Sequence, residues 1–282
     1  MGKRVKNDMG SDTLRVEIML QAMALGVTPA EFAEFYKIVR GDIDVTGILR
    51  RHDLSPANCG SPEASERKRR AAGSSELKDA KEKTLTLRVQ MHDVTKPPMW
   101  RELNVPADFT FLQLHKAIQG ACGLEECHLW QFQRKPYDPE LQIGVPSDRK
   151  NPYGMGLEDC THDARKTGIT AFLAEKGQKL VYVYDFGDDW IFNVSVTGIG
   201  PRDGDTAVCT RWKSDLQPIE DTGGIWSYLD LRQAWSERAT LTKRQKEELA
   251  DRFGYDSFDD LMDLVTEAIF DPETVNERLA DI

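Results

Sequence analysis

The strongest constraint on the fold is a strict alternation of apolar and polar residues between Thr84 and His92. The apolar positions of this stretch are Leu85, Leu87, Val89 and Met91. Successive side chains of a strand point to opposite faces, so a period of two predicts a strand with one buried and one solvated face. A second alternating stretch runs from Trp190 to Val196. At least two half-buried strands are therefore expected.

The second alternating stretch belongs to a predicted hairpin. Residues 180–184 form a continuous apolar and aromatic run, and the acidic segment 185–189 separates this run from the alternating stretch. This order predicts two paired strands with an acidic tip. Turn chemistry is favoured for Asp185 and Asp188, because Asp side chains cap turns and Gly187 can supply a positive φ.

Helix signals accompany the strands. Thr110 and Gln113 have the spacing of a capping box, and His115 is expected on the inward face of the helix that follows. The segment Asp271-Pro272-Glu273 predicts the start of the last helix. From Ser236 onward the chain carries 13 acidic and 6 basic residues. This charge argues against contact between the C-terminal helices and a phosphate backbone.

The N-terminal part of the chain has a different composition. Apolar residues at helical spacing between Asp12 and Val39 predict a helical extension over residues 1–54. Residues 55–83 are predicted to be a flexible linker, since Leu77 is the only large apolar residue there. The basic run Arg67 to Arg70 is interpreted as solvated, although it and the N-terminal helices are the two places where nucleic acid could bind.

The composition limits the class of protein. A chain of 282 residues with a net charge of −10 is not expected to be a dedicated nucleic-acid coat. Its first residues are polar and no apolar run approaches the roughly 20 residues of a membrane span, so a cytoplasmic chain without membrane contact is expected. Five cysteines, an odd number without paired close spacing, fit a reduced compartment.

Five segments are informative when they are taken together. They are Lys96–Arg101, Leu114–His115, His128–Phe132, Tyr182–Trp190 and Pro218–Gly224. In order and spacing they resemble the plasmid pRiA4b ORF-3-like family. The resemblance covers about residues 84–235, and Phe270–Glu273 followed by Val275-Asn276 is similar to the usual C-terminal ending of the family.

This resemblance implies an α+β domain over residues 84–235, with a largely antiparallel sheet and packed helices, encoded on plasmids and near transposases. Residues 236–282 are then expected to be acidic C-terminal helices. Family members often have histidine where this chain has Phe192 and cysteine where it has Thr222. Both differences remove residue types that bind metals.

Two sets of candidate site residues follow. An aromatic and acidic cleft could bind a peptide or a cationic ligand, although its four aromatic residues are interpreted first as core residues. The candidates for this cleft are Trp130, Tyr184, Asp185, Asp188, Trp190, Asp221 and Trp226. A weaker set could bind a divalent metal if the fold gathers it. This metal set is His115, His128, Asp185, Asp188 and Cys209.

The expected function is a binding module for a protein or peptide, with no cofactor predicted. One alternative is a metal-dependent hydrolase that uses Asp185, Asp188, His115 and His128. Another is a DNA accessory factor of a mobile element. The differences at Phe192 and Thr222 favour binding over catalysis, and His115 and His128 are interpreted first as hydrogen-bonded core histidines.

Overall fold

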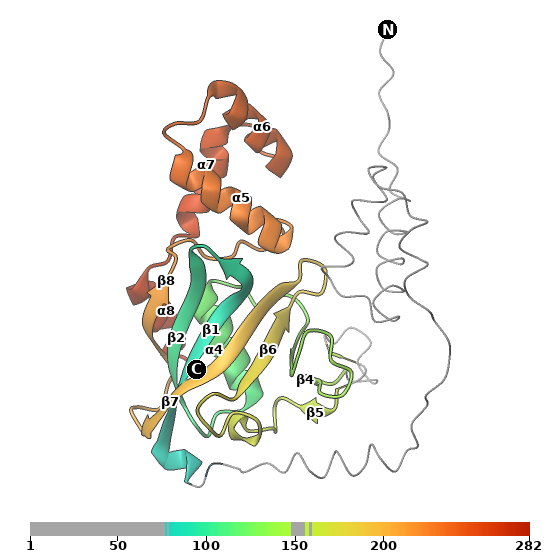
Figure 1. Cartoon of the computed structure of the whole chain (residues 1–282), viewed down its shortest axis with the longest axis vertical. Helices are drawn as coiled ribbons and strands as arrows, with labels where there is room; N and C mark the ends of the chain where they lie inside the picture. Colours follow the sequence, from blue (N-terminus) through green and yellow to red (C-terminus); the bar gives the residue numbers. More distant parts are fainter. Residues whose placement is uncertain (1–76, 78, 148–155, 158–159) are drawn as a thin grey trace, which may run out of the picture. The chain divides into compact units, whose positions relative to one another are not determined.

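The computed structural model describes residues 77, 79–147, 156–157 and 160–282 (Figure 1). The predicted extension over residues 1–54, most of the predicted linker over residues 55–83 and the Arg67 to Arg70 run lie outside these residues. None of the helices in the described part of the chain is long and apolar enough to cross a membrane.

One mixed sheet forms the centre of the domain. Its strands are β1 (Lys83–Thr95), β2 (Pro98–Pro106), β3 (Trp130–Gln133), β4 (Ile143–Gly144), β5 (His162–Asp163), β6 (Lys179–Tyr184), β7 (Trp190–Pro201) and β8 (Val208–Lys213). They lie in the order β5-β4-β3-β6-β7-β1-β2-β8. Every neighbouring pair is antiparallel except β4 and β5. The predicted α+β class with a largely antiparallel sheet is confirmed.

The helices are placed on one face and at one end of the sheet. They are α4 (Phe111–Cys122), α5 (Gly224–Glu237), α6 (Lys243–Phe253), α7 (Phe258–Glu267) and α8 (Pro272–Leu279). Figure 1 shows α4 behind the sheet and α5 to α7 gathered at one end. The last helix, α8, packs against α4 and β8. The predicted domain boundary at residue 235 falls inside α5, and the domain boundaries stay a prediction.

Local sequence signals explain several of these elements. The apolar side chains of β1, which alternate in sequence, are all buried, and so are Trp190, Phe192 and Val194 on β7. Thr110 and Gln113 form the predicted capping box, and Asp271 caps α8. The third strand, β3, starts at Trp130, two residues after His128.

Arg101, which ends the first motif segment, is fully buried in the core. Its guanidinium group donates to the carbonyl oxygens of Ala121 at 3.1 Å, Lys213 at 3.1 Å and Ser214 at 3.1 Å. It also stacks on the ring of Phe270, 4.1 Å from the ring centroid. A buried charge needs such a set of acceptors. This one side chain therefore ties β2 to α4, to the end of β8 and to the segment before α8.

The two edges of the sheet are closed in different ways. At one edge β5 has only two residues, which leaves little backbone to pair. At the other edge the amide of Asn276, on α8, contacts the backbone of Cys209 on β8. Its Oδ1 accepts from the Cys209 N–H at 2.8 Å, and its Nδ2 donates to the Cys209 carbonyl at 3.3 Å. A side chain thus takes the place of a neighbouring strand.

Candidate functional site

Three segments that are distant in sequence meet at the end of the sheet where β3 begins. They are the loop after α4, the turn between β6 and β7, and the loop before α5. The Asp185 N–H donates to the Leu129 carbonyl at 2.9 Å, and the Gly223 N–H donates to Asp188 Oδ2 at 3.1 Å. These bonds hold the β6–β7 turn against both loops.

His128 is at the centre of this junction. Its Nε2 lies 3.6 Å from Asp185 Oδ2, 3.6 Å from Glu220 Oε2 and 3.4 Å from Asp221 Oδ1. The Nε2 atom is buried, yet no hydrogen-bond partner for it exists among the described residues. The expectation of a hydrogen-bonded core histidine is therefore wrong for His128.

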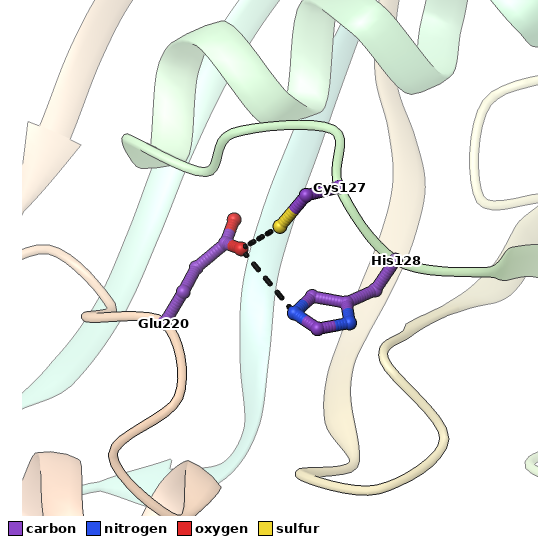
Figure 2. A group of neighbouring side chains, drawn as sticks. All are labelled: Cys127, His128 and Glu220. Atoms are coloured by element: carbon purple, nitrogen blue, oxygen red, sulfur yellow. Dashed lines mark hydrogen bonds and ion pairs between the residues drawn. The ribbon is translucent and has the colours of Figure 1, made fainter.

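Glu220 connects His128 to a thiol. Its Oε2 lies 2.7 Å from Cys127 Sγ, and Figure 2 shows the carboxylate pointing toward both Cys127 and His128. The other oxygen, Oε1, accepts from the Tyr184 hydroxyl at 2.9 Å and from the Glu125 N–H at 2.5 Å. Partial desolvation and the hydrogen bond to Glu220 raise the pKa of the exposed Cys127 thiol, so in the absence of a cation the thiol donates to the carboxylate.

The cluster has the composition of a metal site. We call Cys127, His128, Asp185, Glu220 and Asp221 the His128 cluster. Two triads within it share His128, and in each triad one donor atom per residue lies within 4.8 Å of the others. The triads are Cys127, His128 and Glu220, and His128, Asp185 and Asp221. Imidazole, thiolate and carboxylate are the ligands that zinc takes in proteins.

The acidic turn keeps its own hydrogen bonds. Asp185 Oδ1 accepts from the Gly187 N–H at 2.9 Å, which confirms a turn role for Asp185. Gly187 does not supply the positive φ that we expected. Asp185 and Asp189 have φ of 54° each, a conformation that Asp tolerates better than most residues. Burial raises the pKa of Asp189 to about 6, and the Tyr137 hydroxyl donates to this carboxyl group.

Two of the metal candidates lie in the core. His115 is stacked on Trp130 with ring centroids 3.9 Å apart, and its Nδ1 is 2.7 Å from the Tyr182 hydroxyl. Its burial and this hydrogen bond confirm the interpretation of His115 as a hydrogen-bonded core histidine, and burial lowers its pKa to about 3. Cys209 is buried on β8, and burial raises its pKa to about 11. Neither residue belongs to the triads at His128.

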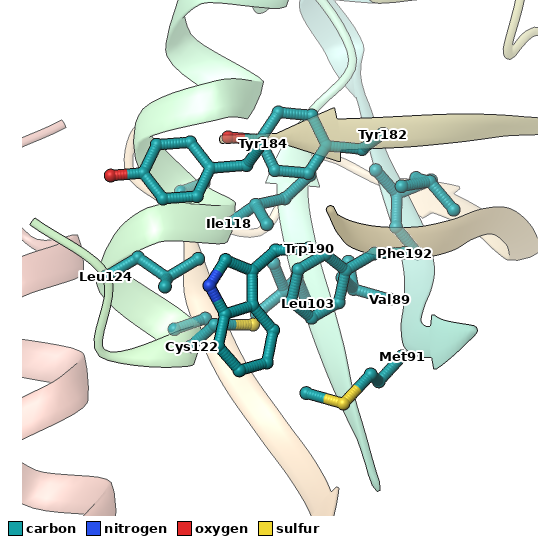
Figure 3. Close-up of a cluster of buried hydrophobic side chains, with 14 of the residues drawn as sticks. Val89, Met91, Leu103, Ile118, Cys122, Leu124, Tyr182, Tyr184, Trp190 and Phe192 are labelled. Atoms are coloured by element: carbon teal, nitrogen blue, oxygen red, sulfur yellow. The ribbon is translucent and has the colours of Figure 1, made fainter. Parts of the chain in front are cut away.

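The aromatic candidates divide into two groups. Trp130, Tyr184 and Trp190 are buried, and Figure 3 shows Tyr184 and Trp190 packed among core side chains. Trp226 is 70% exposed on α5, so the interpretation of this residue as core is wrong. The acidic candidates Asp185 and Asp221 are brought together at His128, whereas Asp188 accepts a backbone hydrogen bond from Gly223.

Comparison with known proteins identifies the family. A model of the plasmid pRiA4b ORF-3-like protein family matches residues 83–277. The chain belongs to this family. It is 26% identical over 166 residues to the uncharacterized protein y4hQ of Sinorhizobium fredii, which covers 58% of this chain and 80% of that protein. It is also similar to the crystal structure of a protein of unknown function, MM3350 from Methanosarcina mazei, with a TM-score of 0.50 and 25% identity. That match covers 68% of this chain and 97% of the other.

The positions at which this chain departs from the pRiA4b ORF-3-like pattern lie in two different environments. Phe192 is fully buried in the core, as a dry position would require. Thr222 adjoins Asp221, and its hydroxyl donates to the Ile219 carbonyl at 2.7 Å. The first departure is therefore a packing residue, and the second stabilises the loop that carries Glu220 and Asp221.

Sequence reasoning missed two members of the His128 cluster. Glu220 lies inside the pRiA4b ORF-3-like segment Pro218–Gly224, and Cys127 is the residue before His128. Both residues are direct neighbours, in the sequence, of residues that were chosen as candidates. A search for all metal-ligand types beside His128 and Asp221 would have included them.

Proposed function

We propose that the domain binds a divalent transition metal at the His128 cluster, with zinc as the ion that best fits the ligand types. The observation that carries the proposal is the buried Nε2 atom of His128. It has three carboxylate oxygens within 3.6 Å but no hydrogen-bond partner among the described residues. A metal ion would give this nitrogen a ligand role.

The charge balance of the cluster supports a cation. Asp185, Glu220 and Asp221 bring three carboxylates to one imidazole. A protonated histidine offsets one negative charge at most, whereas a divalent ion adds two positive charges at the point where the carboxylates converge. Tyr184 supports the arrangement because its hydroxyl fixes the orientation of the Glu220 carboxylate.

We propose that the domain is a binding module for a protein or peptide and that the metal site belongs to its binding surface. The Asp221 side chain is 80% exposed, so the ion would lie where a partner can approach. A hydrolase built from Asp185, Asp188, His115 and His128 has less support, since His115 is stacked on Trp130 and Asp188 binds the Gly223 N–H. The revised ligand set replaces these two residues with Cys127, Glu220 and Asp221.

Metal titration of the full chain tests the proposal. Protein purified without a metal-affinity tag should bind one equivalent of zinc, and cobalt in its place should give an absorption band from a thiolate ligand. At one hundred times the dissociation constant, zinc should raise the free energy of unfolding by about 2.7 kcal/mol. Cys127→Ser should lose the thiolate band, and His128→Ala should lose most of the affinity.

His92→Ala is the matched control, because His92 also lies 3.6 Å from an aspartate, Asp93, outside the cluster. This variant should bind zinc as the wild type does. The proposal is wrong if the wild type holds no stoichiometric metal, or if His92→Ala and His128→Ala weaken zinc binding equally.

A further inference from the structure

A cavity of about 610 Å³ adjoins the His128 cluster. It lies between the end of α4, the segment 217–220 and the helices α7 and α8. Its volume is that of an ordinary ligand pocket. Glu220 lines this cavity and also belongs to the His128 cluster, so the cavity and the cluster adjoin at this residue.

The cavity has an excess of acidic side chains. Besides Glu220, it is lined by Glu125, Glu126, Glu267 and Asp281. Among the described residues, none of these four carboxylates forms an ion pair with a lysine or arginine. Glu126 does lie 3.8 Å from His115 Nε2, but this imidazole, with its pKa lowered to about 3, is neutral at pH 7. The wall also contains two basic residues, Lys116 and Arg278, so its five acidic side chains still outnumber the basic ones.

A polar group in the wall also lacks a partner. Gln217 lines the cavity and is only 7% exposed, and its Oε1 has no hydrogen-bond partner in the part of the chain that the structure describes. Buried amide oxygens are nearly always hydrogen-bonded, so this oxygen is available to accept from a donor group of a bound ligand. Around Gln217 the wall is apolar, with Leu124, Ile219 and Leu264.

We infer that this cavity binds a lysine-bearing segment of a protein partner. The methylene groups of a lysine side chain fit against apolar residues while the ammonium group reaches carboxylates. Lys116 and Arg278, which also line the cavity, can donate to carbonyl oxygens of the bound segment. This assignment adds the chemistry of the partner to the proposed function. It rests on that function in one respect, namely that the partner binds at the face of the domain that carries the His128 cluster.

Fluorescence anisotropy with the full chain tests this inference. The probe is a fluorescein-labelled peptide of alternating lysine and alanine, and the control probe has glutamate in place of lysine. The lysine peptide should bind at physiological salt and the glutamate peptide should not. Binding should persist in EDTA, so the loss of zinc binding alone would leave the cavity assignment standing.

A matched pair of double variants separates the cavity from the net charge. Glu267→Lys with Asp281→Lys reverses two charges of the cavity, and Asp263→Lys with Glu277→Lys reverses two exposed charges outside it. Both pairs change the net charge by the same amount. The cavity pair should weaken binding of the lysine peptide at least tenfold, and the control pair less than threefold.

Two results would overturn the inference. One is that the lysine peptide fails to bind the wild type, and the other is that both double variants weaken binding equally. Zinc titration of the cavity pair separates this failure from that of the proposed function, since the His128 cluster keeps all its members in this variant.

Discussion

His115 and His128 are thirteen residues apart, and their environments are opposite. The His115 side chain is 3% exposed, its Nδ1 is hydrogen-bonded to the neutral Tyr182 hydroxyl, and a single carboxylate, that of Glu126, lies 3.8 Å from its Nε2. The His128 side chain is 30% exposed, and its Nε2 faces three carboxylates. Burial with a neutral partner keeps an imidazole uncharged, whereas several surrounding carboxylates favour a cation. The comparison shows that position on an apolar face does not decide the role of a histidine.

The largest change in stability is expected for a substitution in the core, where His115 also lies. Trp190→Ala should lower the free energy of unfolding by about 3 to 5 kcal/mol, because Trp190 is 1% exposed and its removal leaves a large cavity. Urea unfolding measures the change. Without metal, His128→Ala should change the same quantity by less than about 1 kcal/mol, and equal losses in the two variants would contradict the distinction between core and cluster.

The pH dependence of stability sharpens the comparison at His115. Its pKa is about 3 in the folded protein and 6.5 in the unfolded chain, so below pH 6.5 only the unfolded state takes up the proton. The His115 contribution to stability should therefore fall by roughly 1.4 kcal/mol per pH unit as the pH drops from 6.5 toward 3. His115→Gln lacks this proton uptake, and its stability should fall less steeply.

Protonation of Asp189 changes the stability in the direction opposite to protonation of His115, so the two contributions must be measured separately. Its pKa is raised from 3.8 to about 6 by burial, so the folded state gains relative stability as the pH falls from 6 toward 3.8. The difference between wild type and His115→Gln removes this shared contribution. Urea unfolding at pH 6.5, 5.5 and 4.5 gives that difference, and parallel pH profiles would show that His115 titrates normally.

The smallest effect on stability is expected at Trp226. Because this side chain is 70% exposed, Trp226→Ala should change the free energy of unfolding by no more than about 0.5 kcal/mol. Thermal or urea unfolding measures it beside Trp190→Ala. A loss of several kcal/mol would mean that Trp226 packs against the fold in solution.

The fold could be predicted from sequence where the signal is local. The alternation in β1 and β7 and the capping box at Thr110 depend on residues a few positions apart, and both are present in the structure. The family resemblance supplied the largely antiparallel sheet, which local patterns leave open. Trp226 was misjudged because the presence of one aromatic residue does not say which face of its helix packs against the protein.

The candidate site could be predicted only in part. His128, Asp185 and Asp221 were chosen for their chemistry, but the bonds that gather them join segments separated by 56 residues (Leu129 to Asp185) and 35 residues (Asp188 to Gly223). No spacing rule covers such distances in sequence. His115 was chosen with the same logic as His128, and only the packing of α4 against Trp130 separates them.

The contact between Asn276 and the backbone of Cys209 also affects how copies of this protein meet one another. An open strand edge is a template for pairing with another chain, and such pairing leads to aggregation. At β8 one amide occupies the donor and the acceptor of the same edge residue. An incoming strand would have to displace α8 before it could pair there, so the last helix protects the sheet against edge-to-edge assembly.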